Sequence, residues 1–201
     1  MTKPYDKIGN KLYQLHPGAW EQIIDAARQL SIQKRDEHKR ERDMAFASCR
    51  EAIACDPQSG SAWVDMGALH YGSKDLKNAR ICFETATSVD PDYSLAWFDL
   101  ANVLEEIGQV QESKRCYLSA IAVSPQYADA HFNLGLVYEK LGENRAAIKH
   151  YELYLKHTGD ADLHRTVIQG RIKALRAKDL RCVPKPAVSS TVNESRSAKV
   201  T

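Results

Sequence analysis

The stretch that decides the fold is SLAWFDLANVLEEIGQVQESKRCYLSAIAVSP, from Ser94 to Pro125. Its apolar residues recur three and four apart on both sides of Gly108, which is typical of two helices joined by a glycine turn. The chain on either side repeats this spacing, because Pro57, Pro91 and Pro125 follow one another at intervals of 34 residues. A fixed period of this length predicts a stack of repeated helix pairs.

The composition is that of an ordinary globular chain. It has 201 residues, 43% of them apolar, with 28 Lys and Arg against 26 Asp and Glu, so it can form one or two small domains with a core. The middle of the chain is mildly acidic and the C-terminal end is basic. The five cysteines form no CxxC pair and no zinc-like cluster, which favours a reducing compartment. No signal peptide and no apolar run of about 20 residues is present, so we expect a cytoplasmic protein without a membrane span.

The N-terminal part departs from the period. An apolar stripe that starts at Trp20 is followed by the charged segment 33–43, and apolar spacing then resumes up to Pro57. We expect a divergent, elongated first helix pair over 18–59. A separate N-terminal cap is the alternative, and residues 18–43 could form one long helix or a helix and a loop.

Three clear units follow, over 60–93, 94–127 and 128–159. After them, 160–180 is predicted to be a capping helix, because a stack must cover its last apolar face. Its expected apolar side is formed by Leu163, Val167, Ile168, Ile172 and Leu175. We expect an irregular tail over 1–17 and a disordered one over 181–201.

The repeated unit resembles the tetratricopeptide repeat (TPR), with its pattern W-x-x-L-G-x-x-Y followed by A, F, A and P. The first clear unit matches at Trp63, Met66, Gly67, Ala79, Phe83, Ala86 and Pro91, and the second at Trp97, Leu100, Ala101, Gly108, Tyr117, Ala120 and Pro125. The third matches at Leu134, Gly135, Tyr138, Gly142, Ala147 and Tyr151, with His131 in the tryptophan place. The resemblance implies an all-α fold: a right-handed superhelical stack of antiparallel helix pairs, or TPR solenoid.

The resemblance also implies a concave groove lined by the first helix of each pair. Fixed offsets from the tryptophan place then give an acidic wall with aromatic and asparagine neighbours, which favours a ligand with basic side chains. The candidate partner-binding residues are Asp65, Tyr71, Phe98, Asp99, Asn102, Glu105, Asp129, Phe132, Asn133 and Glu139.

One well-known binding mode of the family fits poorly. Some TPR modules hold the acidic C-terminal tail of heat-shock chaperones in a clamp of Lys, Asn and Arg. Asn102 and Asn133 match the clamp asparagines, but Phe98, Leu163 and Val167 stand where the basic residues belong. The asparagines can still hydrogen-bond the backbone of an extended peptide.

The sequence has no phosphate loop, no GxSxG turn and no HExxH motif, and its seven histidines are scattered. We therefore expect no catalysis, no cofactor and no metal site. The leading prediction is a protein-binding scaffold, adaptor or co-chaperone. The alternatives are a secretion-type chaperone for effector or translocator segments and nucleic-acid association through the basic residues 165–185. The sequence leaves the oligomeric state open.

Overall fold

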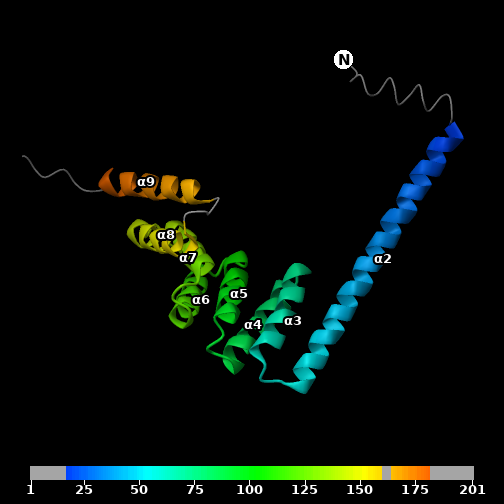
Figure 1. The fold of residues 1–201 in the computed structure, drawn as a ribbon, viewed down its shortest axis with the longest axis horizontal. Helices are drawn as coiled ribbons and strands as arrows, with labels where there is room; N and C mark the ends of the chain where they lie inside the picture. Colours follow the sequence, from blue (N-terminus) through cyan, green and yellow to red (C-terminus); the bar gives the residue numbers. More distant parts are fainter. Residues whose placement is uncertain (1–16, 160–163, 182–201) are drawn as a thin grey trace, which may run out of the picture. The chain divides into compact units, whose positions relative to one another are not determined.

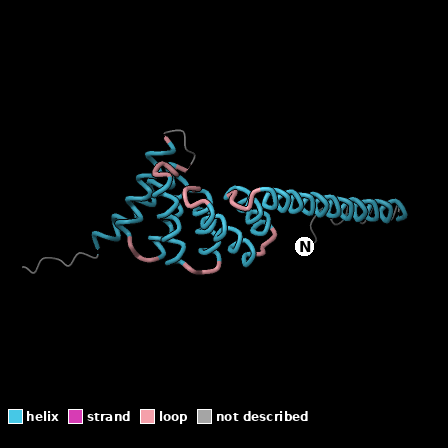
Figure 2. Tube along the Cα trace, turned by 90° about the horizontal axis from the view of Figure 1, so that it is seen from below, coloured by secondary structure: helices cyan, strands magenta, loops and turns pink. Residues whose placement is uncertain are grey.

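The computed structural model describes residues 17–159 and 164–181, and this part of the chain contains helices and turns but no strand (Figures 1 and 2). The two expected tails, apart from Pro17 and Arg181 at their inner ends, and Leu163 lie outside the described residues. The helices are α2 (Pro17–Cys55), α3 (Gly60–Gly72), α4 (Leu76–Val89), α5 (Ser94–Glu106), α6 (Val110–Val123), α7 (Ala128–Lys140), α8 (Asn144–Thr158) and α9 (Arg165–Arg181).

Close approach of the two helices in a pair depends on a glycine. A Cβ added to Gly67 of α3 would lie 2.6 Å from the ring of Phe83 in α4. The same relationship recurs 68 residues later, where a Cβ on Gly135 of α7 would lie 2.5 Å from the ring of Tyr151 in α8. Both rings are buried at these contacts. The glycines therefore leave the space that the large aromatic side chains fill.

The turns inside the pairs share one geometry. Each contains a residue with positive φ, namely Lys74 (62°), Gly108 (84°) and Gly142 (75°). The amide of the next residue donates to a carbonyl five residues earlier, at 2.8–2.9 Å in all three turns. Two of the three positions are glycine because the left-handed region favours a residue without a Cβ.

A ring near the start of each first helix forms a second repeated contact. The ring nitrogen bonds a proline carbonyl six residues earlier, which fixes the loop that enters the helix. The pairs are Trp63 with Pro57 (2.9 Å), Trp97 with Pro91 (2.8 Å) and His131 with Pro125 (3.1 Å). His131 therefore makes the same hydrogen bond as the two tryptophans.

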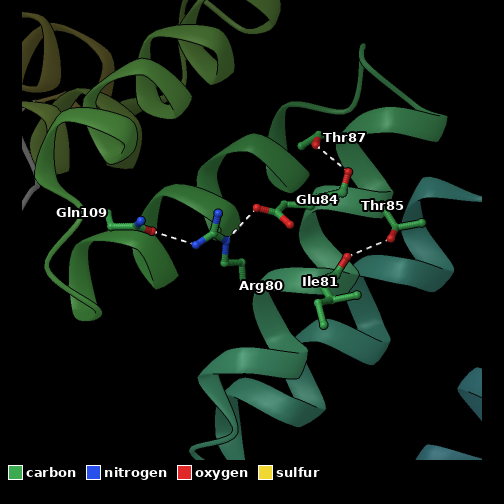
Figure 3. Close-up of polar contacts among 6 residues, drawn as sticks. All are labelled: Arg80, Ile81, Glu84, Thr85, Thr87 and Gln109. Atoms are coloured by element: carbon green, nitrogen blue, oxygen red, sulfur yellow. Dashed lines mark hydrogen bonds and ion pairs between the residues drawn. The ribbon is translucent and has the colours of Figure 1, made fainter.

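The chain divides into two compact units, residues 1–109 and residues 110–201. In the first unit, Arg80 of α4 donates to Glu84 at 2.6 Å and to the side chain of Gln109 at 2.9 Å (Figure 3). These bonds tie α4 to the turn that follows α5.

In the second unit, α9 packs on α8 through Ile168, Ile172 and Leu175, which are 2–6% exposed. The expectation that Val167 shares this side is wrong, since Val167 is 66% exposed. Adjacent residues of a helix point about 100° apart, so Val167 cannot share the face that Ile168 defines.

The segment 18–59, for which we expected a helix pair, holds the single 39-residue helix α2. Within α2, neither glycine nor proline occurs after Gly18, and the charged stretch 33–43 consists largely of good helix formers. Nothing in the sequence therefore ends the helix before Asp56 and Pro57. Its C-terminal turns contact α3, where the ring of Phe46 lies 4.9 Å from that of His70.

Candidate functional site

A pocket of about 140 Å³ opens between α3 and α5 in the first unit. Its polar wall is formed by Asp99 and Asn102, which lie one turn apart on α5. Its other walls are formed by Ala68, Tyr71 and Gly72 of α3 and by Phe83 of α4. Three of the predicted groove residues, Tyr71, Asp99 and Asn102, therefore meet at one place. Phe83 joins them because its ring passes under Gly67.

The carboxylate of Asp99 is poorly solvated. Burial raises its pKa to about 6, and a hydrogen bond from Asn102 offsets only part of this effect. Among the described residues, no basic side chain forms an ion pair with Asp99. Near neutral pH the pocket therefore holds a carboxylate without a neighbouring positive charge, which favours a cationic ligand.

Tyr71 extends the acidic character of the pocket. A hydrogen bond to the carboxylate of Glu106, together with burial and the charges of Asp99 and Glu105, raises the pKa of Tyr71 to about 12. Its hydroxyl thus stays protonated and donates to Glu106. Lys74 approaches Glu106 at 3.4 Å and lies 5.6 Å from the centre of the Tyr71 ring.

Glu106 and Lys74 belong to this site, but the sequence reasoning missed them. They stand in the last turn of α5 and in the turn after α3, outside the fixed offsets from which the groove was predicted. The 34-residue register gives no signal for them, because the corresponding positions one unit away are a glycine in each case, Gly72 and Gly108.

The remaining predicted residues of the first unit lie around the pocket rather than in it. Asp65 is exposed on α3, and its charge contributes to the raised pKa values of Cys49 and Tyr93. Phe98 and Glu105 are half-buried on α5.

In the second unit, two predicted groove residues have structural partners. Glu139 accepts a 2.8 Å hydrogen bond from the hydroxyl of Tyr151, and its Oε1 lies 3.2 Å from Nε of Arg171. Phe132 packs at 5.4 Å from the ring of Tyr154 and joins the core cluster of this unit. These contacts explain both side chains by packing and pairing.

The other two predicted residues of the second unit remain accessible to different degrees. Asp129 is exposed in the first turn of α7, and Asn133 is half-buried one turn further along the same helix. Neither lines the pocket of the first unit, so the predicted residues do not form a single site.

Two general features bound what the described residues can do. None of them gather into a group of three or more His, Cys, Asp or Glu side chains that could hold a metal ion. Over the same ranges, no helix is long and apolar enough to cross a membrane.

Comparison with known families matches four stretches of the chain. Models described as tetratricopeptide repeat match residues 60–93, 82–115 and 129–157, and one described as TPR repeat matches 106–142. A search of curated proteins found no significant match.

Solved structures with a similar fold include two crystal structures of MamA. One is 22% identical, with a TM-score of 0.59, and the match covers 76% of this chain and 84% of that one. The other is 21% identical, with a TM-score of 0.55, and covers 73% and 94%. The first TPR of Spaghetti (RPAP3), bound to the HSP90 peptide SRMEEVD, is 15% identical, with a TM-score of 0.56, and covers 62% and 96%.

The family matches, the paired helices and these structural neighbours agree. The chain is a tetratricopeptide repeat protein with an all-α solenoid fold.

Proposed function

We propose that this TPR protein is a non-catalytic scaffold that binds an extended, basic segment of a partner protein, with one lysine or arginine side chain in the pocket between α3 and α5. The observation that carries the proposal is the buried carboxylate of Asp99, which has no basic partner among the described residues. A cationic side chain would supply the charge that this carboxylate lacks.

The rest of the pocket suits the same ligand. The ring of Phe83 and the small residue Ala68 offer apolar surface to the alkyl part of a lysine or arginine. The ring of Tyr71 offers a face to a cation. The side-chain amide of Asn102 adds a donor and an acceptor for the peptide backbone.

The charges disfavour the acidic peptide held by one structural neighbour. SRMEEVD carries three carboxylate side chains and one arginine, whereas Asp99, Glu105 and Glu106 are all near Tyr71 in this chain. A co-chaperone that captures an acidic tail is therefore a poor fit. A scaffold or chaperone in the cytoplasm that receives basic segments is the role we propose.

Nucleic-acid binding through α9 is less favoured. Arg171 pairs with Glu139, and Arg176 pairs with Glu152 at 2.5 Å. The acidic partners reduce the positive charge that α9 can offer to phosphates.

The proposal is tested by fluorescence anisotropy with two labelled peptides that differ at one position. A nine-residue peptide of Ser, Ala and Gly with one central arginine is compared with its citrulline counterpart, which keeps the shape and loses the charge. The arginine peptide should bind more tightly by at least about tenfold, because a desolvated ion pair is lost with citrulline. Equal binding of the two peptides would contradict the proposal.

Two variants locate the effect. Asp99→Asn should remove the preference for arginine while keeping the size of the side chain. Asp65→Asn is the matched control, because Asp65 occupies the same place in the preceding unit but is exposed and does not line the pocket. Loss of the preference in both variants would point to general surface charge instead.

A further inference from the structure

The long helix α2 carries apolar side chains that nothing in the structure covers. Ile23, Ile24 and Leu30 are 46–58% exposed and, with Trp20 and Ala27, follow the spacing of one helix face. Every residue from Glu21 to Met44 is exposed, whereas the last turns of the helix contact α3 (Figure 1). A long stretch of α2 therefore projects from the first unit without a neighbour among the described helices.

The C-terminal part of α2 matches the second helix of a TPR unit. Ala45, Cys49 and Ala52 stand 34 residues before Ala79, Phe83 and Ala86, which are 0–2% exposed. In α2 the corresponding residues are half-buried or exposed. This part of α2 thus presents the core positions of a second helix, while the first helix that should cover them is absent from its side.

The N-terminal part of α2 has the features of that missing first helix. Trp20 takes the tryptophan place, and the glycine place, four residues later, is occupied by Ile24. In the intact pairs, the glycine place faces the large ring of Phe83 or Tyr151. In α2 the sizes are exchanged, because the facing position is the small Cys49. A large side chain opposite a small one fills the same space.

Both parts lie on the same side of one helix. Ile24 and Cys49 are 25 residues apart, which at 3.6 residues per turn brings them to within about 20° of each other around the axis. Two continuous helices that run antiparallel can therefore make both contacts at once, each N-terminal part covering the C-terminal part of the other.

Folding back within one chain is disfavoured by the connecting segment. The turns in the other pairs use a residue with positive φ, which is glycine in two of three cases. Residues 33–43 contain no glycine, proline or asparagine and are helical throughout. The helix would have to break within good helix formers to close on itself.

We propose that α2 is a dimerisation helix, which pairs antiparallel with α2 of a second copy so that Ile24 of each chain packs against Cys49 of the other. The arrangement exchanges an equivalent element between two copies, and its two-fold symmetry makes the two contacts identical. This inference is independent of the ligand in the pocket.

The charged middle of α2 is compatible with this register. If Ile24 faces Cys49, Lys34 faces position 39 of the second copy, which lies between His38 and Glu41 on the contacting side. Glu41 is then about 3 Å further along the axis, within reach of the Lys34 ammonium. The symmetry gives two such Lys34–Glu41 pairs.

The first test is sedimentation equilibrium of the full chain. We expect a monomer–dimer equilibrium in the wild type, and Ile24→Glu should raise the dissociation constant by at least about tenfold, because a charge would be buried in the contact. Ile32→Glu is the matched control: Ile32 is also exposed on α2 but points about 130° away from Ile24's apolar side by helical geometry. A wild-type monomer at all concentrations, or equal effects of the two variants, overturns the proposal.

The second test separates exchange from an intramolecular hairpin. Ile24→Cys places a thiol opposite Cys49, within the Cα separation of about 4.4–6.8 Å that a disulfide needs. Mild oxidation should then give a covalent dimer on a non-reducing gel, and adding Cys49→Ala should abolish it. A disulfide closed within one chain, or no cross-link at all, overturns the second copy as the occupant.

Discussion

The ring of Tyr151 lies so close to Gly135 that a Cβ at position 135 would be 2.5 Å from Cε1 of the ring. Because Tyr151 is fully buried and its hydroxyl is bonded to Glu139, the ring has little room to move. Gly135→Ala should therefore lower the free energy of unfolding by about 1–3 kcal/mol, as other overpacked cores do. Urea unfolding followed by circular dichroism measures this change.

Gly170→Ala is the matched control for that prediction. Gly170 lies in α9, where an added Cβ meets nothing within 4 Å. The better helix propensity of alanine should then leave the protein as stable as the wild type or more stable by up to about 1 kcal/mol. Equal stability of the two alanine variants would contradict the close approach.

Acid should destabilise the second unit through its two buried histidines. His131 bonds the Pro125 carbonyl through Nε2, so its Nδ1 accepts the 3.0 Å hydrogen bond that Nδ1 of His150 donates. Burial lowers the pKa of both, that of His150 to about 4, with the charges of His131 and Lys149 as further causes. The ring of His157 near His131 acts in the same direction on His131.

Since both folded-state pKa values are depressed, this contribution to stability is complete above about pH 6.5 and is lost as the pH falls toward the folded values. His131→Trp keeps the bond to Pro125 that Trp63 and Trp97 make and removes one of the two titrating rings. The melting temperature should therefore drop less for His131→Trp than for the wild type between about pH 7.5 and about pH 5. Exposed His38→Gln serves as the control, and an unchanged drop in His131→Trp would refute the role of the pair.

The repeat scaffold was predictable from the sequence because its contacts recur at a fixed interval. Gly67 with Phe83 and Gly135 with Tyr151 are the same contact in two units, and His131 keeps the hydrogen bond of the tryptophans it replaces. Such positions are fixed by packing, which the period records.

The site was predictable only in part. The offsets brought Asp99, Asn102 and Tyr71 to one pocket, but they said nothing about Glu106, which depends on the turn after each helix. They also could not indicate that Glu139 is paired with Arg171, because α9 lies outside the repeat pattern. The continuous helix α2 is a third example: the charged segment permits both a helix and a turn, and only the absence of a breaking residue favours the helix.

Asp99 should be a residue that the fold tolerates at a cost. Its folded-state pKa is raised above its ordinary value of 3.8, so its contribution favours the folded state at low pH and is lost as the pH rises through about 6. At about pH 7.5, Asp99→Asn should thus stabilise the first unit, by about 1 kcal/mol once solvent screening is allowed for. A variant less stable than the wild type at that pH would show that the carboxylate has a stabilising partner.

The peptide SRMEEVD should not bind this chain. The pocket lacks a basic side chain beside Asp99, and Glu105 and Glu106 add negative charge near Tyr71. Anisotropy with labelled SRMEEVD should show no saturable binding at low salt, where repulsion is strongest. The scrambled peptide is the control, and specific binding of SRMEEVD would contradict the acidic pocket.

The most direct test of the central claim, that Asp99 receives a cationic side chain, is the number of protons released on binding. Calorimetry of the arginine peptide at about pH 6, in buffers of different ionisation enthalpy, should show release of about half a proton per peptide, because ion pairing lowers the pKa of a half-protonated Asp99. Asp99→Asn should release none, and Asp65→Asn should release as much as the wild type. Binding of the arginine peptide without proton release in the wild type would contradict the claim.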